Sequence, residues 1–403
     1  MNRDFEDGRS GFATRLAIYY GGIFLIVGSF TPYFPVWLDA RGMSSGQIGF
    51  MLAVPLFIRV LFTPAVSFAA DRIGDHRLVL KMLSWGTFCT MIILIWCDSF
   101  WQIFAAALII SLFWTTIMPL TETLAMTGVR LADLDYGRMR LWGSLTFIVA
   151  SLGGGYVIEG FGALSSIWLF ITAAALLLLA SQMLPRPKGL GRLKAATTGS
   201  PIRFSEALSL ARSPIFLLFL ITSSLVSAGH AIYYSFGTLH WQTLGISTGT
   251  IGALWAIGVI AEIVLFAYSR PVVARIGSLN LILIAGFAAV LRWSVTATDP
   301  PLALLMPLQI LHGLTFGAAH LGSIYFISES VPAAYAATAQ GLYAAFAAGL
   351  VMGAAMLGAG TLYDLVAGKA YFVMAAMGVL SVACSFLLIK LWNGKPLFAE
   401  RTD

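Results

Sequence analysis

Residues 42–49 read GMSSGQIG, and residues 245–252 read GISTGTIG, so one eight-residue pattern occurs twice at an offset of 203 residues. The triplet Arg-Ile-Gly at 72–74 recurs at 275–277 with the same offset. Two independent matches at one offset indicate an internal repeat, in which each copy is one structural unit. The chain is therefore predicted to consist of two halves built on the same plan.

The composition is that of an all-α, multi-pass membrane protein. The chain has 403 residues, of which 59% are hydrophobic and 10% charged, with a mean hydropathy of +0.87. A soluble domain carries about 25% charged residues, and a helix needs about 20 apolar residues to cross a bilayer. We predict twelve such helices, and we expect the first to be retained and not cleaved as a signal peptide. The predicted spans are 16–38, 46–70, 78–97, 100–129, 138–159, 165–184, 214–242, 249–273, 279–297, 302–330, 338–364 and 370–392.

Charged residues predict the orientation and the domain boundary. Most of the 24 Lys and Arg residues fall on the side of the membrane that holds the N-terminus. Because basic loops stay in the cytoplasm, both termini are expected there, in the cell inner (plasma) membrane. The Pro-, Gly- and Arg-rich stretch 185–213 is expected to be a cytoplasmic linker between an N-terminal bundle, 1–184, and a C-terminal bundle, 214–403. The net charge of +6 reflects these loops and does not indicate a nucleic-acid partner.

Six spans in each repeat give both halves the same orientation. Parallel six-helix repeats joined by a cytoplasmic linker are the architecture of major facilitator transporters, whose substrate site lies between the halves. The sequence has no phosphate-binding loop of the form GxxxxGK[ST], which argues against an ATP-driven pump. Cys89, Cys97 and Cys384 lack the paired spacing of a disulfide framework or a metal site. We expect a monomeric transporter, not an enzyme, with no cofactor.

Glu122 and Arg140 lie at equal distances from a short polar turn centred on residue 131. If two helices flank this turn, the two charges lie at equal depth on facing helices, no more than about 13 Å below it. A charge inside the membrane is costly unless it is paired or hydrated. Arg140 is expected either to bind a substrate carboxylate through its bidentate fork or to be a structural arginine. Glu122 is its partner, a proton site or half of an internal salt bridge. Arg138, one turn from Asp135, is expected to be structural.

The C-terminal half contains further polar residues inside predicted spans. Glu262, near the middle of its span, is expected to carry the coupling proton, or else to form a permanent ion pair. Arg59 occupies the matching position of the first half, where it is either functional or a charge at the interface between halves. Arg292 either takes part in coupling or snorkels to the nearby outer surface. A further group is expected to line a polar cavity rather than bind a metal, with plain packing as the alternative for each histidine: His230, Tyr233, Tyr234, Gln309, His312, Phe316 and His320.

Three features resemble known families. Residues 67–74, SFAADRIG, resemble the loop signature of the major facilitator superfamily, which assigns a gating role to Asp71, Arg72 and Gly74. Residues 135–144, DYGRMRLWGS, resemble the start of helix 5 in the 3-phenylpropionate permeases and, more distantly, in lactose permease, where an acid 18 residues before the arginine joins it in the sugar site. The C-terminal half resembles the phenylpropionate permeases at 229–236, 258–262, 291–293 and 308–312, followed by His320.

This resemblance implies a proton symporter that imports a small organic acid. We expect the substrate site to contain Glu122, Arg140, His230, Tyr233, Tyr234, Gln309, His312 and Phe316, and proton coupling to involve Glu262, His312 and Arg292. Thr315 stands where lactose permease has its proton-linked carboxylate, so we expect Glu262 to take that role. A proton on Glu262 would then free Arg140 to bind the substrate anion. A sugar or nucleoside symporter is the alternative. Efflux and a non-transporting receptor are further possibilities, and the charges within the spans argue against the receptor.

Overall fold

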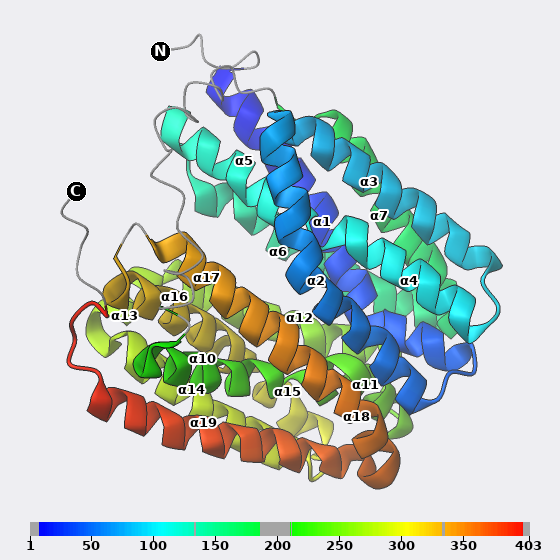
Figure 1. Cartoon of the computed structure of the whole chain (residues 1–403). Coiled ribbons are helices and arrows are strands. Elements are labelled where there is room, and N and C mark those ends of the chain that lie inside the picture. Colours follow the sequence, from blue (N-terminus) through cyan, green and yellow to red (C-terminus); the bar gives the residue numbers. More distant parts are fainter. Residues whose placement is uncertain (1–7, 133, 186–209, 211, 333–334, 398–403) are drawn as a thin grey trace. The chain divides into compact units, whose positions relative to one another are not determined.

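The computed structural model describes residues 8–132, 134–185, 210, 212–332 and 335–397, and within these ranges the regular structure is entirely helical (Figure 1). Eleven stretches of this part are long and apolar enough to cross a membrane. The last stretch, Thr338–Leu391, has 54 residues and contains two of the predicted spans. They are separated near Ala367, whose positive φ of 46° interrupts the helix. Each of the twelve predicted spans therefore corresponds to helix.

The first half follows the predicted spans closely. Ser44 caps its second helix as its sequence suggests, because its hydroxyl accepts the N–H of Gln47 while the Gln47 side chain accepts the N–H of Ser44. The predicted span 100–129 is interrupted by a turn at 115–116. The helices are α1 (Gly8–Ala40), α2 (Ser45–Ile73), α3 (His76–Ile93), α4 (Phe100–Trp114), α5 (Ile117–Ala132), α6 (Tyr136–Phe161) and α7 (Ser166–Gln182).

The second half is more broken than predicted, because four of its six expected spans are divided. Two π-helical segments, Gly313–Ala318 and Ala344–Val351, interrupt the predicted spans 302–330 and 338–364. The helices are α10 (Pro214–Ala228), α11 (Ala231–Thr243), α12 (Thr248–Ala267), α13 (Ser269–Ile276), α14 (Ser278–Thr296), α15 (Leu302–Ile310), α16 (Ala319–Ser330), α17 (Ala336–Tyr343), α18 (Met352–Val366) and α19 (Tyr371–Leu391).

The repeat is visible in backbone geometry as well as in sequence. Gly42 and Gly245 both have a φ of 78°, a left-handed conformation that favours glycine. Gly42 N–H donates to the carbonyl of Asp39 at 2.8 Å, and Gly245 N–H donates to that of Gln242 at 3.0 Å. The following serine of each copy, Ser44 or Ser247, accepts the backbone N–H three residues later at 3.3 Å. Equivalent hydrogen bonds at the 203-residue offset confirm the repeat as a structural unit.

The chain forms two compact units, each described here by itself. Unit 1 comprises the described part of Met1–Thr198 together with Gly237–Ala256. The second segment joins it closely, because Gly249 N–H donates to the Glu159 carboxylate at 2.8 Å and a Cβ at Gly252 would lie 2.3 Å from the Ser151 carbonyl oxygen. Unit 2 comprises the described part of Gly199–Phe236 and Ile257–Asp403, with a core that includes Phe219, Ile282 and Phe326.

The two-bundle division at 185–213 remains a prediction from the repeat, and most of that linker lies outside the described residues. The gating signature ends α2 as its glycine suggests. Gly74 adopts a φ of 80° and donates its N–H to the Ala70 carbonyl, a left-handed helix cap. Asp71 lies 3.1 Å from the Nε2 of His76 at the start of α3. These contacts define a compact turn between the two helices.

Candidate functional site

In unit 1, Glu122 and Arg140 face each other as the hairpin predicts. Glu122 lies on α5 and Arg140 on α6, with Glu122 Oε1 3.7 Å from Arg140 Nε. Both side chains are about one-third exposed. The Arg140 guanidinium carbon lies 4.1 Å from the centre of the Phe24 ring, close enough for a cation–π contact. Arg138, expected to be structural, instead pairs with Asp135 at 3.5 Å on an exposed surface.

In unit 2, Arg292 is the centre of a buried polar cluster. It lies on α14 with no exposed surface, so the structure excludes the alternative in which it snorkels to the outside. Its Nη1 donates to His312 Nδ1 at 3.1 Å and to Thr315 Oγ1 at 3.0 Å. Its Nη2 donates to Gln309 Oε1 at 2.9 Å. Three neutral acceptors from one neighbouring segment therefore surround the guanidinium.

The hydrogen bonds determine the tautomer of His312. A guanidinium can only donate, so His312 Nδ1 must accept and the ring proton lies on Nε2. That Nε2 lies 3.9 Å from Oε2 of Glu262 on α12. The neutral imidazole thus stands between a carboxylate and a guanidinium. The sequence led us to expect that Glu262 reaches toward Arg140. In the structure, Glu262 lies beside His312, a residue of the same unit.

His230 has the opposite tautomer. Its Nδ1 lies 3.1 Å from the carbonyl of Val226 and 3.2 Å from that of Ser227, so this nitrogen carries the proton. Its Nε2 then accepts from the Thr315 hydroxyl at 3.1 Å. Thr315 accepts from Arg292 and donates to His230, which uses its hydroxyl fully. The sequence showed Thr315 only as a missing carboxylate, and its position three residues after His312 was the available signal for this role.

Aromatic rings surround this cluster. The Arg292 guanidinium carbon lies 4.9 Å from the Tyr233 ring centre and 4.4 Å from that of Trp293. A desolvated cation–π contact contributes about 2 kcal/mol, which helps to offset the cost of a buried guanidinium. Trp293 was not predicted as a site residue, although it follows Arg292 directly. Tyr234, which was predicted, stacks on the His230 ring at 5.5 Å.

The rings of His312, Phe316 and His320 share one face, as their spacing predicts. His312 and Phe316 stack with centres 5.4 Å apart, and Phe316 and His320 with centres 6.2 Å apart. Phe316 is 38% exposed, whereas His312 is 7% exposed. The stack therefore links the exposed Phe316 to His312, which contacts Arg292.

The backbone around His312 is built for close packing. The π-helical segment Gly313–Ala318 follows His312 directly, and such single-turn insertions occur often at functional sites. A Cβ at Gly258 on α12 would lie 3.2 Å from the His312 Cβ. A Cβ at Gly313 would lie 3.0 Å from the Ala261 backbone. The two glycines thus let α12 approach closely enough to bring Glu262 to His312.

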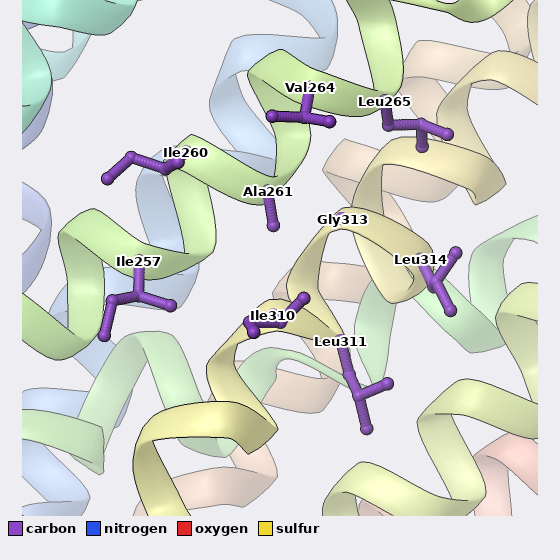
Figure 2. A pocket seen from close by; sticks show the side chains of 9 residues that line it. All are labelled: Ile257, Ile260, Ala261, Val264, Leu265, Ile310, Leu311, Gly313 and Leu314. Carbon is purple, nitrogen blue, oxygen red and sulfur yellow. The ribbon is translucent and has the colours of Figure 1, made fainter.

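A separate apolar cavity lies on the other side of this contact. Figure 2 shows the side chains that line it, which come from α12 and from Ile310, Leu311 and Leu314. Its volume is about 550 Å³. All nine lining residues are apolar, among them Ile257, Ile260, Val264 and Leu314. Glu262 and His312 do not line it. The polar cluster and this cavity are therefore different features.

The predicted site residues thus form two groups, one in each unit. Within the described ranges, no group of three or more His, Cys, Asp or Glu residues is arranged to hold a metal ion. Arg59, at the repeat position that matches Glu262, is partly buried on α2. Its expected role stays a prediction.

Comparison with known proteins agrees with the fold and with the resemblance in the sequence. The "Probable 3-phenylpropionic acid transporter" of Escherichia coli (strain K12) is 29% identical over 372 residues, covering 90% of this chain and 94% of the relative. The lactose permease of Citrobacter freundii is 22% identical, covering 91% of each chain. The crystal structure of the nucleoside transporter NupG matches with a TM-score of 0.81 at 20% identity, covering 94% of this chain and 100% of that one, and it supports the fold.

The twelve-helix architecture, the repeat and these relatives agree with a match to the family described as MFS_1 like, which spans residues 13–374. That match covers most of the chain. The protein therefore belongs to the MFS_1 like family and is a multi-pass membrane transporter of the major facilitator type.

Proposed function

We propose that this transporter imports a small aromatic or other organic carboxylate, such as 3-phenylpropionate, together with a proton by alternating access. We place it as a monomer in the cell inner membrane with both termini in the cytoplasm, as the basic residues predict. Protons are the coupling ion in this proposal, and no cofactor takes part. The similarity to the probable 3-phenylpropionic acid transporter supports the substrate class.

The arrangement of Glu262, His312 and Arg292 carries the proposal. Glu262 lies 3.9 Å from one ring nitrogen of His312, and Arg292 donates to the other at 3.1 Å. An unbalanced charge within the membrane costs about 2.5–3.5 kcal/mol on insertion scales. An ionised Glu262 balances Arg292 when the site is empty. A substrate anion takes over that balance, and Glu262 then holds a proton.

Proton and anion are thereby linked through one positive charge. Binding of either ligand favours binding of the other, as reciprocal coupling requires. One carboxylate and one proton enter together, so the pH gradient drives accumulation of the acid. Glu262 is the proton site in this scheme, and His312 relays its charge state to Arg292.

A sugar or nucleoside symporter is the second candidate function. The pairing of Glu122 with Arg140 favours it, because an acid and an arginine with this spacing resemble the sugar site of lactose permease. Paired charges of this kind can hydrogen-bond to sugar hydroxyls. In this alternative, Arg140 and Glu122 bind the substrate and Arg292 has no direct contact with it.

Uptake into proteoliposomes tests the proposal. We expect radiolabelled 3-phenylpropionate, and not lactose, to accumulate when the outside is more acidic than the inside. Glu262→Gln mimics the protonated acid, so it should exchange substrate between equal pools yet fail to concentrate it. Measuring exchange and uphill uptake on the same preparation separates coupling from binding.

Glu329→Gln is the matched control, because it is the same substitution within unit 2, at a residue that accepts a hydrogen bond from Ser278 at 2.6 Å. Its uphill uptake should match that of the unmodified protein. Uphill accumulation at the normal level by Glu262→Gln would place the proton site elsewhere. Driven uptake of lactose without 3-phenylpropionate would support the alternative function.

A further inference from the structure

We propose that the Nε edge of the Arg292 guanidinium binds the substrate carboxylate, so that Arg292 and not Arg140 anchors the anion. This inference rests on the proposed function, because it concerns how an organic acid is held. It also changes the role expected for Arg292, from a residue of proton coupling alone to a residue that contacts the substrate.

The first step is that the groups hydrogen-bonded to Arg292 supply no negative charge. Arg292 is completely buried in a membrane-spanning helix, and its three side-chain acceptors, His312, Thr315 and Gln309, are neutral. Glu262 faces it across the ring of His312, with its Oε2 3.9 Å from His312 Nε2, while Arg292 contacts the other ring nitrogen. Buried charges are normally paired, so a guanidinium held by neutral groups is electrostatically ready for an anion.

The second step is an unused donor. Arg292 Nε is buried and has no hydrogen-bond acceptor in the part of the chain that the structure describes. A buried N–H without an acceptor is costly. His312 and Thr315 accept from Nη1, and Gln309 accepts one N–H of Nη2, so the edge that we assign to a ligand is formed by Nε and the second N–H of Nη2. A carboxylate accepts from such an edge with two oxygens.

The third step is the rigidity of the site. Rings of Tyr233 and Trp293 lie 4.9 and 4.4 Å from the guanidinium carbon. Trp293 in turn stacks on Tyr371 at 5.6 Å. Ring contacts and the three hydrogen bonds hold the guanidinium in one orientation. A pre-organised donor loses little entropy when the anion binds.

The fourth step identifies the rest of the ligand. The stacked rings of His312 and Phe316 lead from Arg292 to the partly exposed Phe316. Because these faces are stacked on one another, an acid whose aromatic ring is separated from its carboxylate by a short chain would place its ring against the edges of the stack, next to the exposed part of Phe316. The fitting ligand class is therefore an aromatic carboxylate with a short spacer, such as 3-phenylpropionate.

Arg140 lacks the feature on which this inference depends. Its Nε already faces the Glu122 carboxylate at 3.7 Å, and its side chain is 30% exposed. An incoming anion would have to compete with that carboxylate. Glu262 faces Arg292 through the ring of His312 and not directly, and protonation of Glu262 removes its competition with the anion.

The test measures equilibrium binding of 3-phenylpropionate and of its neutral analogue 3-phenylpropionamide to the purified full-length protein. The unmodified protein should prefer the acid. Arg292→Lys keeps the charge but lacks the fork, so its affinity for the acid should fall on the order of 100-fold. The exposed control Arg138→Lys should change it less than about threefold, and Arg140→Lys should lower it far less than Arg292→Lys does.

A second variant protects the test against misfolding. Gln309→Glu keeps Arg292 and places a carboxylate where the amide oxygen now accepts from Nη2 at 2.9 Å. This internal anion should lower the affinity for the acid by about 10-fold or more and leave the affinity for the amide nearly unchanged. General damage to the site would lower both affinities together. The unfolding temperature of each variant verifies that it is folded.

The outcomes separate this inference from the proposed function. Normal acid affinity in folded Arg292→Lys and Gln309→Glu, with binding intact in the unmodified protein, overturns the inference and leaves the proposed function standing. Loss of acid binding in Arg140→Lys alone assigns the anchor to Arg140 and also overturns it. Failure of the unmodified protein to bind the acid overturns both.

Discussion

Two arginines within membrane-spanning helices have different electrostatic environments. Arg140 in unit 1 lies beside a carboxylate, and both partners are about one-third exposed. Arg292 in unit 2 is completely buried, with three neutral acceptors and two aromatic rings around it. The first charge is balanced locally, whereas the second depends on Glu262 through His312 or on a ligand. In the proposed mechanism, coupling therefore belongs to Arg292, the arginine whose charge balance can change.

The largest expected effect on stability comes from removing an acceptor of the buried arginine. Gln309→Leu deletes the oxygen that accepts from Arg292 Nη2 at 2.9 Å and so leaves that N–H of a buried charge without its acceptor. We expect the free energy of unfolding to fall by about 1–3 kcal/mol. Equilibrium unfolding of the purified protein in detergent measures it. Unchanged stability would mean that water or lipid replaces the lost acceptor, and the contrast with Arg140 would weaken.

A smaller effect compares the two halves through their matching helix caps. Ser44→Ala and Ser247→Ala each remove a hydroxyl that accepts a backbone N–H at 3.3 Å. Each should cost about 1 kcal/mol of unfolding free energy, and the two costs should agree within a few tenths. Ser45→Ala, one residue into α2, is the matched control and should be nearly neutral. Clearly unequal costs would show that the halves differ in stability despite their common geometry.

The smallest effect is expected at the half-exposed pair. Glu122→Gln removes the negative charge 3.7 Å from Arg140, in a place where solvent screens the interaction. The free energy of unfolding should change by about 0–1 kcal/mol, and less at high salt. Unfolding measured at low and high ionic strength tests both points. A loss as large as that of Gln309→Leu would show that Arg140 is as dependent on its partner as Arg292 is on its acceptors.

Local features were predictable because neighbouring residues determine them. The pairing of Glu122 with Arg140 follows from two helices joined by a short turn, and the shared face of His312, Phe316 and His320 follows from helical spacing. The helix cap at Ser44 and the left-handed Gly42 and Gly74 likewise depend on residues close in the chain. The facing of Glu122 and Arg140 and the shared face of the three rings were expected from the sequence, and both are observed.

Composition and periodicity were enough to predict the membrane class, the repeat and the order of the helices. Short spacings along the chain were enough to predict that Glu122 faces Arg140. Tertiary structure alone decided which face Arg292 presents, and hence that it is buried instead of snorkelling. It also decided that Thr315 links Arg292 to His230, a contact between residues 85 positions apart in the chain. The close approach of α12 and the π-helical segment after His312 set that geometry. Such contacts depend on how helices pack, which no local pattern encodes.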